Sequence, residues 1–260
     1  MLIALTRKIS PRLADCELTH LAREPIDIEL AVRQHATYVK LLATLGCASI
    51  ELEAMPQLAD SVFVEDVAIV LDEVAIMTRP GAASRRPETE SMVVALERHR
   101  PLLRIETPGQ LDGGDVLRIG RTVYVGQSGR SNAEGIDQLR SLLARFGYAV
   151  HAVPIRDCLH LKSAVTSLDD QTIIVQPAWL DRDSFDGFRV IEVDPEEAHA
   201  ANVLRVGEQI VMPACFPRTQ QRIESIGFHV NPIDVSELQK AEGAVTCCSL
   251  VFESMKQAPA

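Results

Sequence analysis

The sequence predicts an α/β protein in which five repeated units, each of ββα type, close into a ring. Three observations support this fold class: paired apolar runs recur around short turns, amphipathic helical patterns follow most of the pairs, and each end of the chain has the pattern of a single strand. The chain has 260 residues, of which 47% are hydrophobic, so it can bury the core that such a ring requires. Because no Pro/Ser-rich linker or block of charge interrupts the pattern, we expect one domain over residues 1–260.

Four segments have the pattern of a β-hairpin, with short Val/Ile-rich runs on either side of a two-residue turn. The turns fall at Asp72–Glu73, Gly120–Arg121, Asp169–Asp170 and Gly207–Glu208. A fifth hairpin forms if GAVTCCSLVF, near the end of the chain, pairs with MLIALTRK at its beginning. That pairing closes the ring; without it, an ordinary α/β sheet would explain the same runs.

Helical patterns follow three of the four internal hairpins, over residues 87–99, 131–147 and 218–228. The second of these has Ser131 and Asn132 as N-cap candidates and Gly147 at its end. In the third unit the irregular segment AWLDRDSFDGF stands where a helix is expected. The fifth unit has its helical pattern over residues 24–46, with apolar residues at the helical period.

The composition limits the classes of partner. The formal net charge is −10, whereas a nucleic-acid-binding surface is basic. The N-terminus lacks the basic region and long apolar run of a signal peptide, and no run approaches the roughly 20 apolar residues of a membrane span. We therefore expect a cytoplasmic protein with reduced cysteines and with no nucleic-acid or membrane partner. An acidic cleft could still concentrate a small cation.

Polar residues interrupt or begin the first strand of each predicted unit, and Glu65 and Asp66 lie inside an apolar run. In unit order they are Glu65 and Asp66, Asp112 and Asp115, His160 and Lys162, His199 and Asn202, and Cys247. Because equivalent positions of a ring converge on its axis, these side chains are expected to meet. Together they could supply a thiolate nucleophile, a general acid/base and a wall that binds a cation.

Each of these residues also has an ordinary structural interpretation. A cysteine in an apolar strand is usually part of the core, a histidine is usually a hydrogen-bonded structural residue, and Asp112 beside two glycines could form only a turn. No spacing of cysteine and histidine favours a zinc site, so we predict no metal. The joint placement of the residues is what favours a catalytic site.

Five motifs in order, DSVFVEDVAIV, TRPGAASRR, LDGGDVL, HLKS and TCCSL, resemble those of the dimethylarginine dimethylaminohydrolases. The resemblance covers nearly the whole chain. It implies the five-bladed, pseudo-symmetric α/β propeller of the guanidino-group-modifying enzymes, called the pentein fold. It also implies hydrolysis of asymmetric dimethylarginine or monomethylarginine to citrulline and a methylamine, through an S-alkylthiouronium intermediate on cysteine.

The resemblance implies three catalytic residues. Cys247 matches the nucleophile of the near-terminal motif, and Cys248 fills the variable position beside it. His160 matches the histidine of the H-L-K motif. Asp112 matches the acid that supports this histidine, with Asp115 farther from the reaction.

Five polar side chains would bind the substrate. Glu65 and Asp66 match the pair that holds the guanidinium. Arg85 and Arg130 match the arginines that hold the carboxylate of the substrate. Asp60 is implied at its amino group.

Three further positions match substrate-binding residues: Phe63 beside Asp60, Leu18 in a mobile lid near CELTH, and Ala241 through its backbone carbonyl. The implied partner is a small arginine-derived substrate, no cofactor is needed, and a homodimer is left open.

Lys162 bears on the choice among related reactions. Arginine deiminases resemble this pattern but usually carry an acid two residues after the histidine, and that acid grips the unsubstituted guanidinium nitrogens. Lysine at this position favours a methylated or otherwise N-substituted arginine. The alternatives are an arginine deiminase, a hydrolase of Nω-hydroxyarginine and, in another class, a catalytically silent pentein that acts as a binding module.

Overall fold

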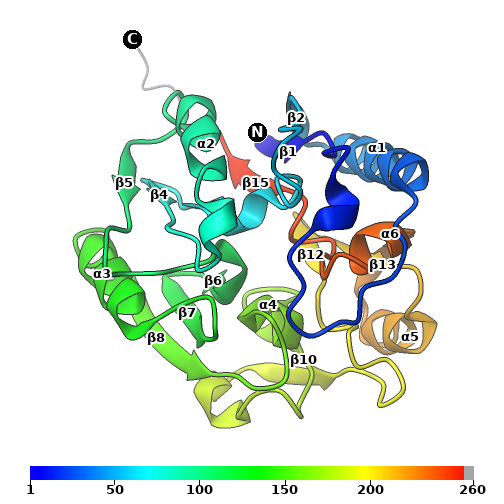
Figure 1. Ribbon diagram of the computed structural model, residues 1–260. Coiled ribbons are helices and arrows are strands. Elements are labelled where there is room, and N and C mark those ends of the chain that lie inside the picture. Colours follow the sequence, from blue (N-terminus) through cyan, green and yellow to red (C-terminus); the bar gives the residue numbers. More distant parts are fainter. Residues whose placement is uncertain (255–260) are drawn as a thin grey trace.

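The computed structural model describes residues 1–254 and shows five blades around a central axis, each a sheet of three strands (Figure 1). In every blade the first two strands are antiparallel and the third is parallel to the second. The blades consist of β3 (Ala68–Val70), β4 (Ala75–Met77) and β5 (Leu102–Arg104); β6 (Val116–Ile119), β7 (Thr122–Gln127) and β8 (Ala149–Pro154); β9 (Val165–Ser167), β10 (Thr172–Val175) and β11 (Arg189–Glu192); β12 (Leu204–Val206), β13 (Gln209–Pro213) and β14 (His229–Ile233); and β15 (Leu250–Glu253), β1 (Leu2–Arg7) and β2 (Ala48–Leu52).

The last blade joins the two ends of the chain and closes the ring. Strand β15 pairs antiparallel with β1, so that Leu2 lies opposite Glu253 and Leu5 opposite Leu250. This pairing confirms the predicted fifth hairpin and excludes an open sheet.

Four of the five blades carry a helix between their second and third strands: α1 (Ile28–Thr44), α2 (Glu88–Leu96), α3 (Ala133–Ala144) and α5 (Pro217–Ser225). The carboxylate of Asp27 caps α1 by accepting a hydrogen bond from the Leu30 amide, and the Asn132 side chain caps α3 in the same way. The third blade has only the 3₁₀ turn η5 (Arg182–Phe185), as the irregular sequence there indicates. None of the helices in residues 1–254 combines the length and apolar character that crossing a membrane requires.

The third strand of each blade is not predicted by the sequence pattern, so the repeat is ββαβ and not ββα alone. β8 combines exposed with buried residues and β11 combines exposed with half-buried ones, and neither has a long buried run. These segments become strands because they form hydrogen bonds with the second strand of the blade, and their own sequence has no clear strand pattern.

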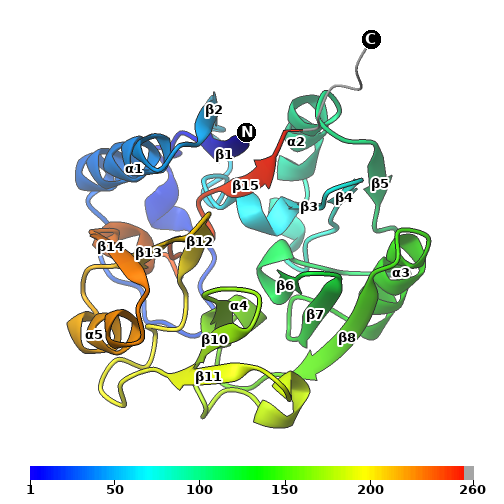
Figure 2. The same cartoon turned by 180° about the vertical axis from the view of Figure 1, so that it is seen from behind.

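The apolar core lies between the blades and their helices and not on the axis. One cluster, for example, joins Ile76 of the first blade to Val123 of the second and to Leu139 and Leu143 of α3. Seen from behind, β3, β6, β12 and β15 surround the centre of the ring (Figure 2). The axis is therefore left to the polar residues that precede these first strands.

Those polar residues do not lie within strands, which corrects the expectation for Glu65 and Asp66. Glu65 and Asp66 occupy a 3₁₀ turn, η2 (Val64–Val67), that ends where β3 begins. Cys247 and its neighbour Cys248 likewise lie in a turn before β15. A strand would send adjacent side chains to opposite faces of a sheet, whereas a turn lets two neighbouring acids stay buried near the axis.

Candidate active site

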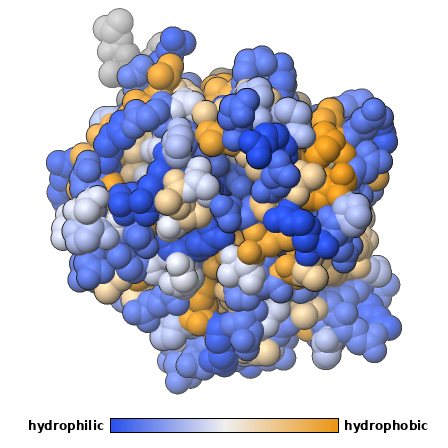
Figure 3. Space-filling model, in the orientation of Figure 1, coloured by the Kyte–Doolittle hydropathy of each residue, from blue (hydrophilic) through white to orange (hydrophobic). Residues whose placement is uncertain are grey.

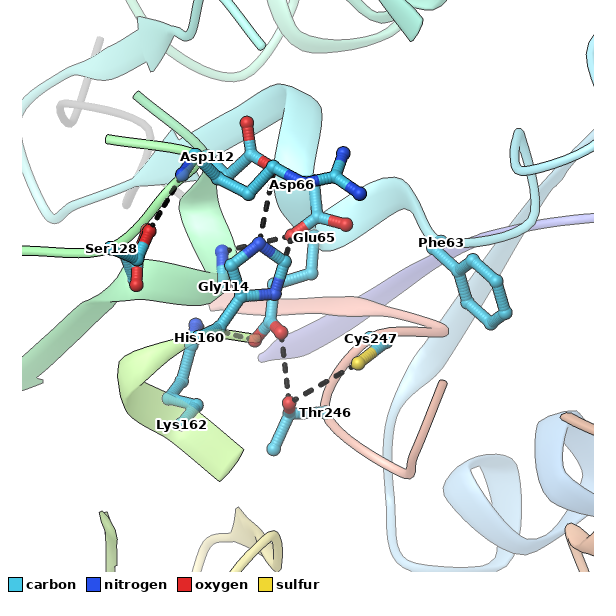
Figure 4. Close-up of polar contacts among 12 residues, drawn as sticks. Phe63, Glu65, Asp66, Asp112, Gly114, Ser128, His160, Lys162, Thr246 and Cys247 are labelled. Carbon is cyan, nitrogen blue, oxygen red and sulfur yellow. Dashed lines mark hydrogen bonds and ion pairs between the residues drawn. The ribbon is translucent and has the colours of Figure 1, made fainter. Parts of the chain in front are cut away.

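His160 lies between the carboxylates of Asp66 and Asp112 (Figure 4). It precedes the short helix α4 (Leu161–Ala164), and its Nε2 lies 3.0 Å from Oδ2 of Asp112. Its Nδ1 lies 3.8 Å from Oδ1 of Asp66. Burial alone would lower the pKa of His160, but Asp66, Asp112 and Asp115 raise it to about 9. The imidazolium form is therefore favoured at neutral pH.

The backbone around His160 is built for close approach. A Cβ on Gly114 would come within 2.5 Å of the His160 Nδ1 atom, so only glycine fits there. Asp115 accepts hydrogen bonds from Ser128, from Ser131 and, at 3.0 Å, from the backbone amide of Leu161. It thus fixes the start of α4, and its burial raises its pKa to about 6.

Cys247 and Cys248 face different surroundings. Cys247 is half-buried and lines the cavity beside His160, with its Sγ 3.9 Å from the Thr246 hydroxyl. Cys248 is 1% exposed, packs into the core under α1 and lies 3.5 Å from the Ala244 carbonyl oxygen. Burial, followed by the charges of Glu65 and Asp66, raises the pKa of Cys247 to about 12. In the absence of a bound cationic ligand, the thiol form of Cys247 is therefore favoured.

The acidic pair is brought to the axis, but each carboxylate already has a cationic partner. Glu65 accepts from the Lys162 ammonium at 2.5 Å and from the Thr246 hydroxyl at 2.8 Å. Asp66 accepts from the Arg85 guanidinium and, at 3.0 Å, from the Gly114 amide. Burial raises the pKa of Glu65 despite Lys162, whereas His160 and Arg85 outweigh burial and lower that of Asp66.

The two arginines that are expected to bind the substrate carboxylate differ in exposure. The Arg85 side chain is buried, and its guanidinium donates to Asp66, to Glu88 and to the carbonyl oxygens of Asp60 and Phe63. Arg130 is only half-buried and donates to the Thr19 hydroxyl at 3.0 Å. Both line one small cavity, but Arg130 has the freer donors for an incoming anion.

That small cavity, here called the narrow cavity, has a volume of about 20 Å³ and a mostly charged lining. Its lining includes six of the predicted substrate-binding residues: Asp60, Phe63, Asp66, Arg85, Arg130 and Ala241. Asp60 accepts from the Glu17 amide, and burial raises its pKa. Leu18 is not among the lining residues of this cavity; it packs against the hydrophobic cluster beneath α1.

A second space, here called the wide cavity, adjoins the first and has a volume of about 320 Å³. It is lined by Glu65, Lys162 and Asn202 near the axis and by residues of the third and fourth blades, including Trp179 and Phe216. The two cavities share five residues: Leu159, His160, Glu242, Gly243 and Cys247. The predicted nucleophile and histidine thus lie where the cavities meet.

A third cavity of about 260 Å³ opens at the other end of the axis, among the first strands of the blades. Glu65 and Lys162 line both this rear cavity and the wide cavity. Their ion pair therefore separates the two, and Asn202 holds the backbone of Lys162 by donating to its carbonyl oxygen.

Glu242 is a site residue that the sequence did not single out. Its carboxylate accepts hydrogen bonds from three consecutive backbone amides, those of Thr19, His20 and Leu21. It has a left-handed backbone with φ of 55° and lines both cavities. An acid in a polar turn has no distinctive pattern, and its role depends on a segment more than two hundred residues away.

Asp66, Asp112 and His160 also present atoms within 4.8 Å of one another, close enough to hold a metal ion. Their donors and acceptors are already used: Asp66 bonds to Arg85 and the Gly114 amide, and Asp112 bonds to His160 and the Gly81 amide. That no metal or cofactor is needed stays a prediction. The six cysteines, all within the described residues, are free thiols.

Comparison with known proteins decides the family. A sequence model described as Arginine deiminase matches residues 48–212. The dimethylarginine dimethylaminohydrolase of Streptomyces coelicolor is 43% identical over 249 residues, which cover 95% of each chain. The chain belongs to the dimethylarginine dimethylaminohydrolase family. The Pseudomonas aeruginosa member of this family is 37% identical over 236 residues, covering 90% of this chain and 92% of that one.

Solved structures of the dimethylarginine dimethylaminohydrolase family share the fold. The Pseudomonas aeruginosa enzyme in complex with citrulline superimposes with a TM-score of 0.92 at 35% identity, covering 96% of this chain and 98% of that one. An adduct of a dimethylarginine dimethylaminohydrolase with S-methyl-L-thiocitrulline also has a TM-score of 0.92 and covers 97% of this chain. The N-terminal domain of ArgZ, at 19% identity and a TM-score of 0.88, shows the same fold. The predicted family and the five-bladed pentein fold are both confirmed.

Proposed function

We propose that this protein hydrolyses Nω-methylated arginine to citrulline and a methylamine. The observation that carries the proposal is that Cys247 and His160, from the fifth and third blades, line one cavity together with the buried acid Glu65. The relatives named above carry the name of this activity, and one is bound to citrulline, the expected product.

Binding of the substrate prepares the nucleophile. A guanidinium that enters beside Glu65 and Asp66 brings positive charge to the field that raises the pKa of Cys247. A cation at this place lowers the pKa of the thiol, so the thiolate forms mainly when the substrate is bound. Glu65 holds the guanidinium by a charge-assisted hydrogen bond. Asp66, whose oxygens already accept from Arg85 and from the Gly114 amide, contributes its negative charge.

The reaction then proceeds in two halves. The thiolate of Cys247 attacks the central guanidino carbon while the imidazolium of His160 protonates the departing amine, which leaves an S-alkylthiouronium on the sulfur. The imidazole, now neutral, takes a proton from water as the water oxygen attacks the same carbon. The carbon–sulfur bond breaks, the thiolate is restored and citrulline is released. Asp112 holds the imidazole through the 3.0 Å contact and favours its charged form.

The narrow cavity suits the amino-acid end of the substrate. We assign Arg130 to the carboxylate and Asp60 to the ammonium group, with the carbonyl of Ala241 as a further acceptor. Phe63 forms a wall, and the lid that contains Leu18 contributes through its backbone. We assign Arg85 to the same end as a buried positive charge, because its donors already bond to protein acceptors.

Lys162 supports a substituted substrate. Its ammonium occupies one oxygen of Glu65, at the place where the deiminases carry an additional acid. The site therefore offers fewer acceptors to unsubstituted nitrogens and leaves room for a methyl group. Nω-hydroxyarginine fits the same argument and is the second candidate substrate.

The test is a competition among asymmetric dimethylarginine, monomethylarginine, Nω-hydroxyarginine and arginine, with citrulline and the released amine both quantified. We expect the highest kcat/KM for a methylated arginine. Citrulline from arginine with comparable efficiency would indicate a deiminase. The absence of citrulline from all four compounds would favour a pentein that only binds its ligand.

We further propose a cytoplasmic location, where the six free thiols stay reduced. A homodimer is proposed from the family resemblance alone, and light scattering of the purified chain tests it.

A further inference from the structure

If arginine derivatives bind as proposed above, the direction of the substrate in the site is set. Its amino-acid end lies in the narrow cavity, against Asp60 and Arg130. Its guanidino carbon lies at Cys247 and His160, which both cavities share. A substituent on a terminal guanidino nitrogen then continues in the same direction and enters the wide cavity.

The wide cavity is much larger than methyl groups require. Its volume is about 320 Å³, whereas one bound water molecule needs only roughly 10–15 Å³ of such space. This volume is within the range of cavities that hold whole small molecules. Two methyl groups would leave most of it to solvent.

The lining away from the axis suits an apolar group. Trp179 of the third blade, Phe216 at the start of α5 and Leu21 of the lid all border the space. Trp179 packs against the His199 ring, with ring centroids 5.0 Å apart, which gives this wall a firm aromatic surface. On the face of the molecule that Figure 1 shows, patches of hydrophobic residues lie among mostly hydrophilic ones (Figure 3).

We propose that the wide cavity binds the Nω-substituent of the substrate and admits alkyl and arylalkyl groups considerably larger than methyl. The substrate class is then arginine carrying a flexible apolar group on one terminal nitrogen, such as Nω-propylarginine or Nω-benzylarginine. The stoichiometry is that of the methylated case: one water is consumed, the bond between carbon and substituted nitrogen breaks, and citrulline and a primary amine form. The amine leaves through the wide cavity, which is the larger of the two spaces that meet at Cys247 and His160.

Binding to the Cys247→Ser variant tests the proposal without requiring turnover. Titration calorimetry compares arginine with its Nω-methyl, dimethyl, propyl and benzyl derivatives. We expect the propyl and benzyl compounds to bind at least as tightly as monomethylarginine, because each methylene group that becomes buried strengthens binding by roughly fourfold. Affinity for the benzyl compound weaker than that for the methyl compound by more than about tenfold overturns the proposal.

The same titrations separate two kinds of failure. Binding of methylated arginines with rejection of the larger derivatives overturns only the role of the wide cavity. Failure of every arginine derivative to bind overturns the proposed function itself.

A bulkier side chain at the rim of the cavity provides the matched test. Cys215 is exposed and lines the wide cavity, so Cys215→Trp narrows it without touching the catalytic residues. In the Cys247→Ser background we expect the affinity for Nω-benzylarginine to fall by about tenfold or more, with that for dimethylarginine unchanged within about twofold. Glu208→Trp, in the exposed turn between β12 and β13, adds the same ring outside the lining and should change neither. Equal weakening of both ligands by Cys215→Trp, or unchanged benzyl binding, contradicts the proposal.

Discussion

The narrow and wide cavities differ in size and in lining, although they meet at Cys247 and His160, the proposed nucleophile and general acid/base. The narrow cavity measures about 20 Å³ and is bordered mainly by charged residues, among them Asp60, Arg85 and Arg130. The wide cavity measures about 320 Å³ and combines polar residues with an apolar and aromatic wall that contains Leu21, Trp179 and Phe216. Substrate selection by this site is therefore divided between two unlike surfaces.

This division indicates which part of the substrate is recognised strictly. A charged hydrogen bond depends on the position of both partners, and a buried charge without its partner is costly. An apolar wall selects mainly by volume and shape, so it discriminates weakly between related groups. The amino-acid end should accordingly be required, while the substituent can vary.

Loss of the nucleophile at the boundary between the cavities should have the largest effect. We expect Cys247→Ser to reduce the rate of citrulline formation by at least about 10⁴-fold, because the weaker nucleophile cannot form the covalent intermediate. Binding at both ends of the substrate should persist. Cys248→Ser is the matched control and should retain most of the activity, since Cys248 is buried in the core. Similar losses from both variants would mean that the wrong sulfur was assigned.

Loss of the histidine should slow the chemistry and spare both binding surfaces. We expect His160→Ala to lower kcat by roughly 10²–10⁴-fold, the usual contribution of a general acid/base. Steady-state kinetics with dimethylarginine, together with calorimetric binding, separate the two effects. A change confined to KM would rule out the proposed role.

The narrow cavity itself is probed by Arg130→Met, which keeps the length of the side chain but removes its charge. We expect KM for dimethylarginine to rise by roughly 10- to 100-fold, the value of one charge-assisted hydrogen bond. The preference between methyl and propyl substituents should stay the same, because it is set in the wide cavity. A changed preference would show that the two surfaces do not act independently.

Glu242 borders both cavities, and its removal should have a smaller effect. We expect Glu242→Ala to raise KM by roughly fivefold, because the lid amides of residues 19–21 lose their shared acceptor. Glu242→Gln keeps an acceptor oxygen, so its KM should lie between those of Glu242→Ala and the original protein. Unchanged KM in Glu242→Ala would mean that the lid is held by its other contacts.

The smallest expected effect concerns stability. The pKa of His160 is raised from 6.5 to about 9 in the folded protein. Between these values the folded state binds more protons at His160 than the unfolded state, so the contribution of His160 to stability is fully present below pH 6.5 and is lost as the pH rises through 9. Melting temperatures over pH 6–10 should show a steeper decline for the original protein than for His160→Gln. Parallel curves would indicate that the acids around His160 do not raise its pKa in solution.

Local patterns predicted much of this fold. The turns at Asp72–Glu73 and Gly207–Glu208 lie between paired strands as expected, and α3 begins after Asn132, one of the two cap candidates. The third strands were beyond such reasoning, because short parallel strands draw their order from their neighbours. For the site, the convergence of Cys247, His160 and Glu65 followed from the repeat, since equivalent positions of a closed ring must meet.

The sequence by itself determined the inventory: five units, their turns and most of their helices, and the nucleophile, histidine and acids that the ring gathers on its axis. These depend on local periodicity and on residue types, which can be read along the chain. Only the tertiary structure decided the partners of the charged groups, the turn that holds Glu65 and Asp66, the lid contact of Glu242 and the unequal size of the two cavities. Each of these features depends on distances between segments that are remote in the chain. The strength of the ion pairs and hydrogen bonds also depends on how deeply the folded protein buries them, and no single segment determines that burial.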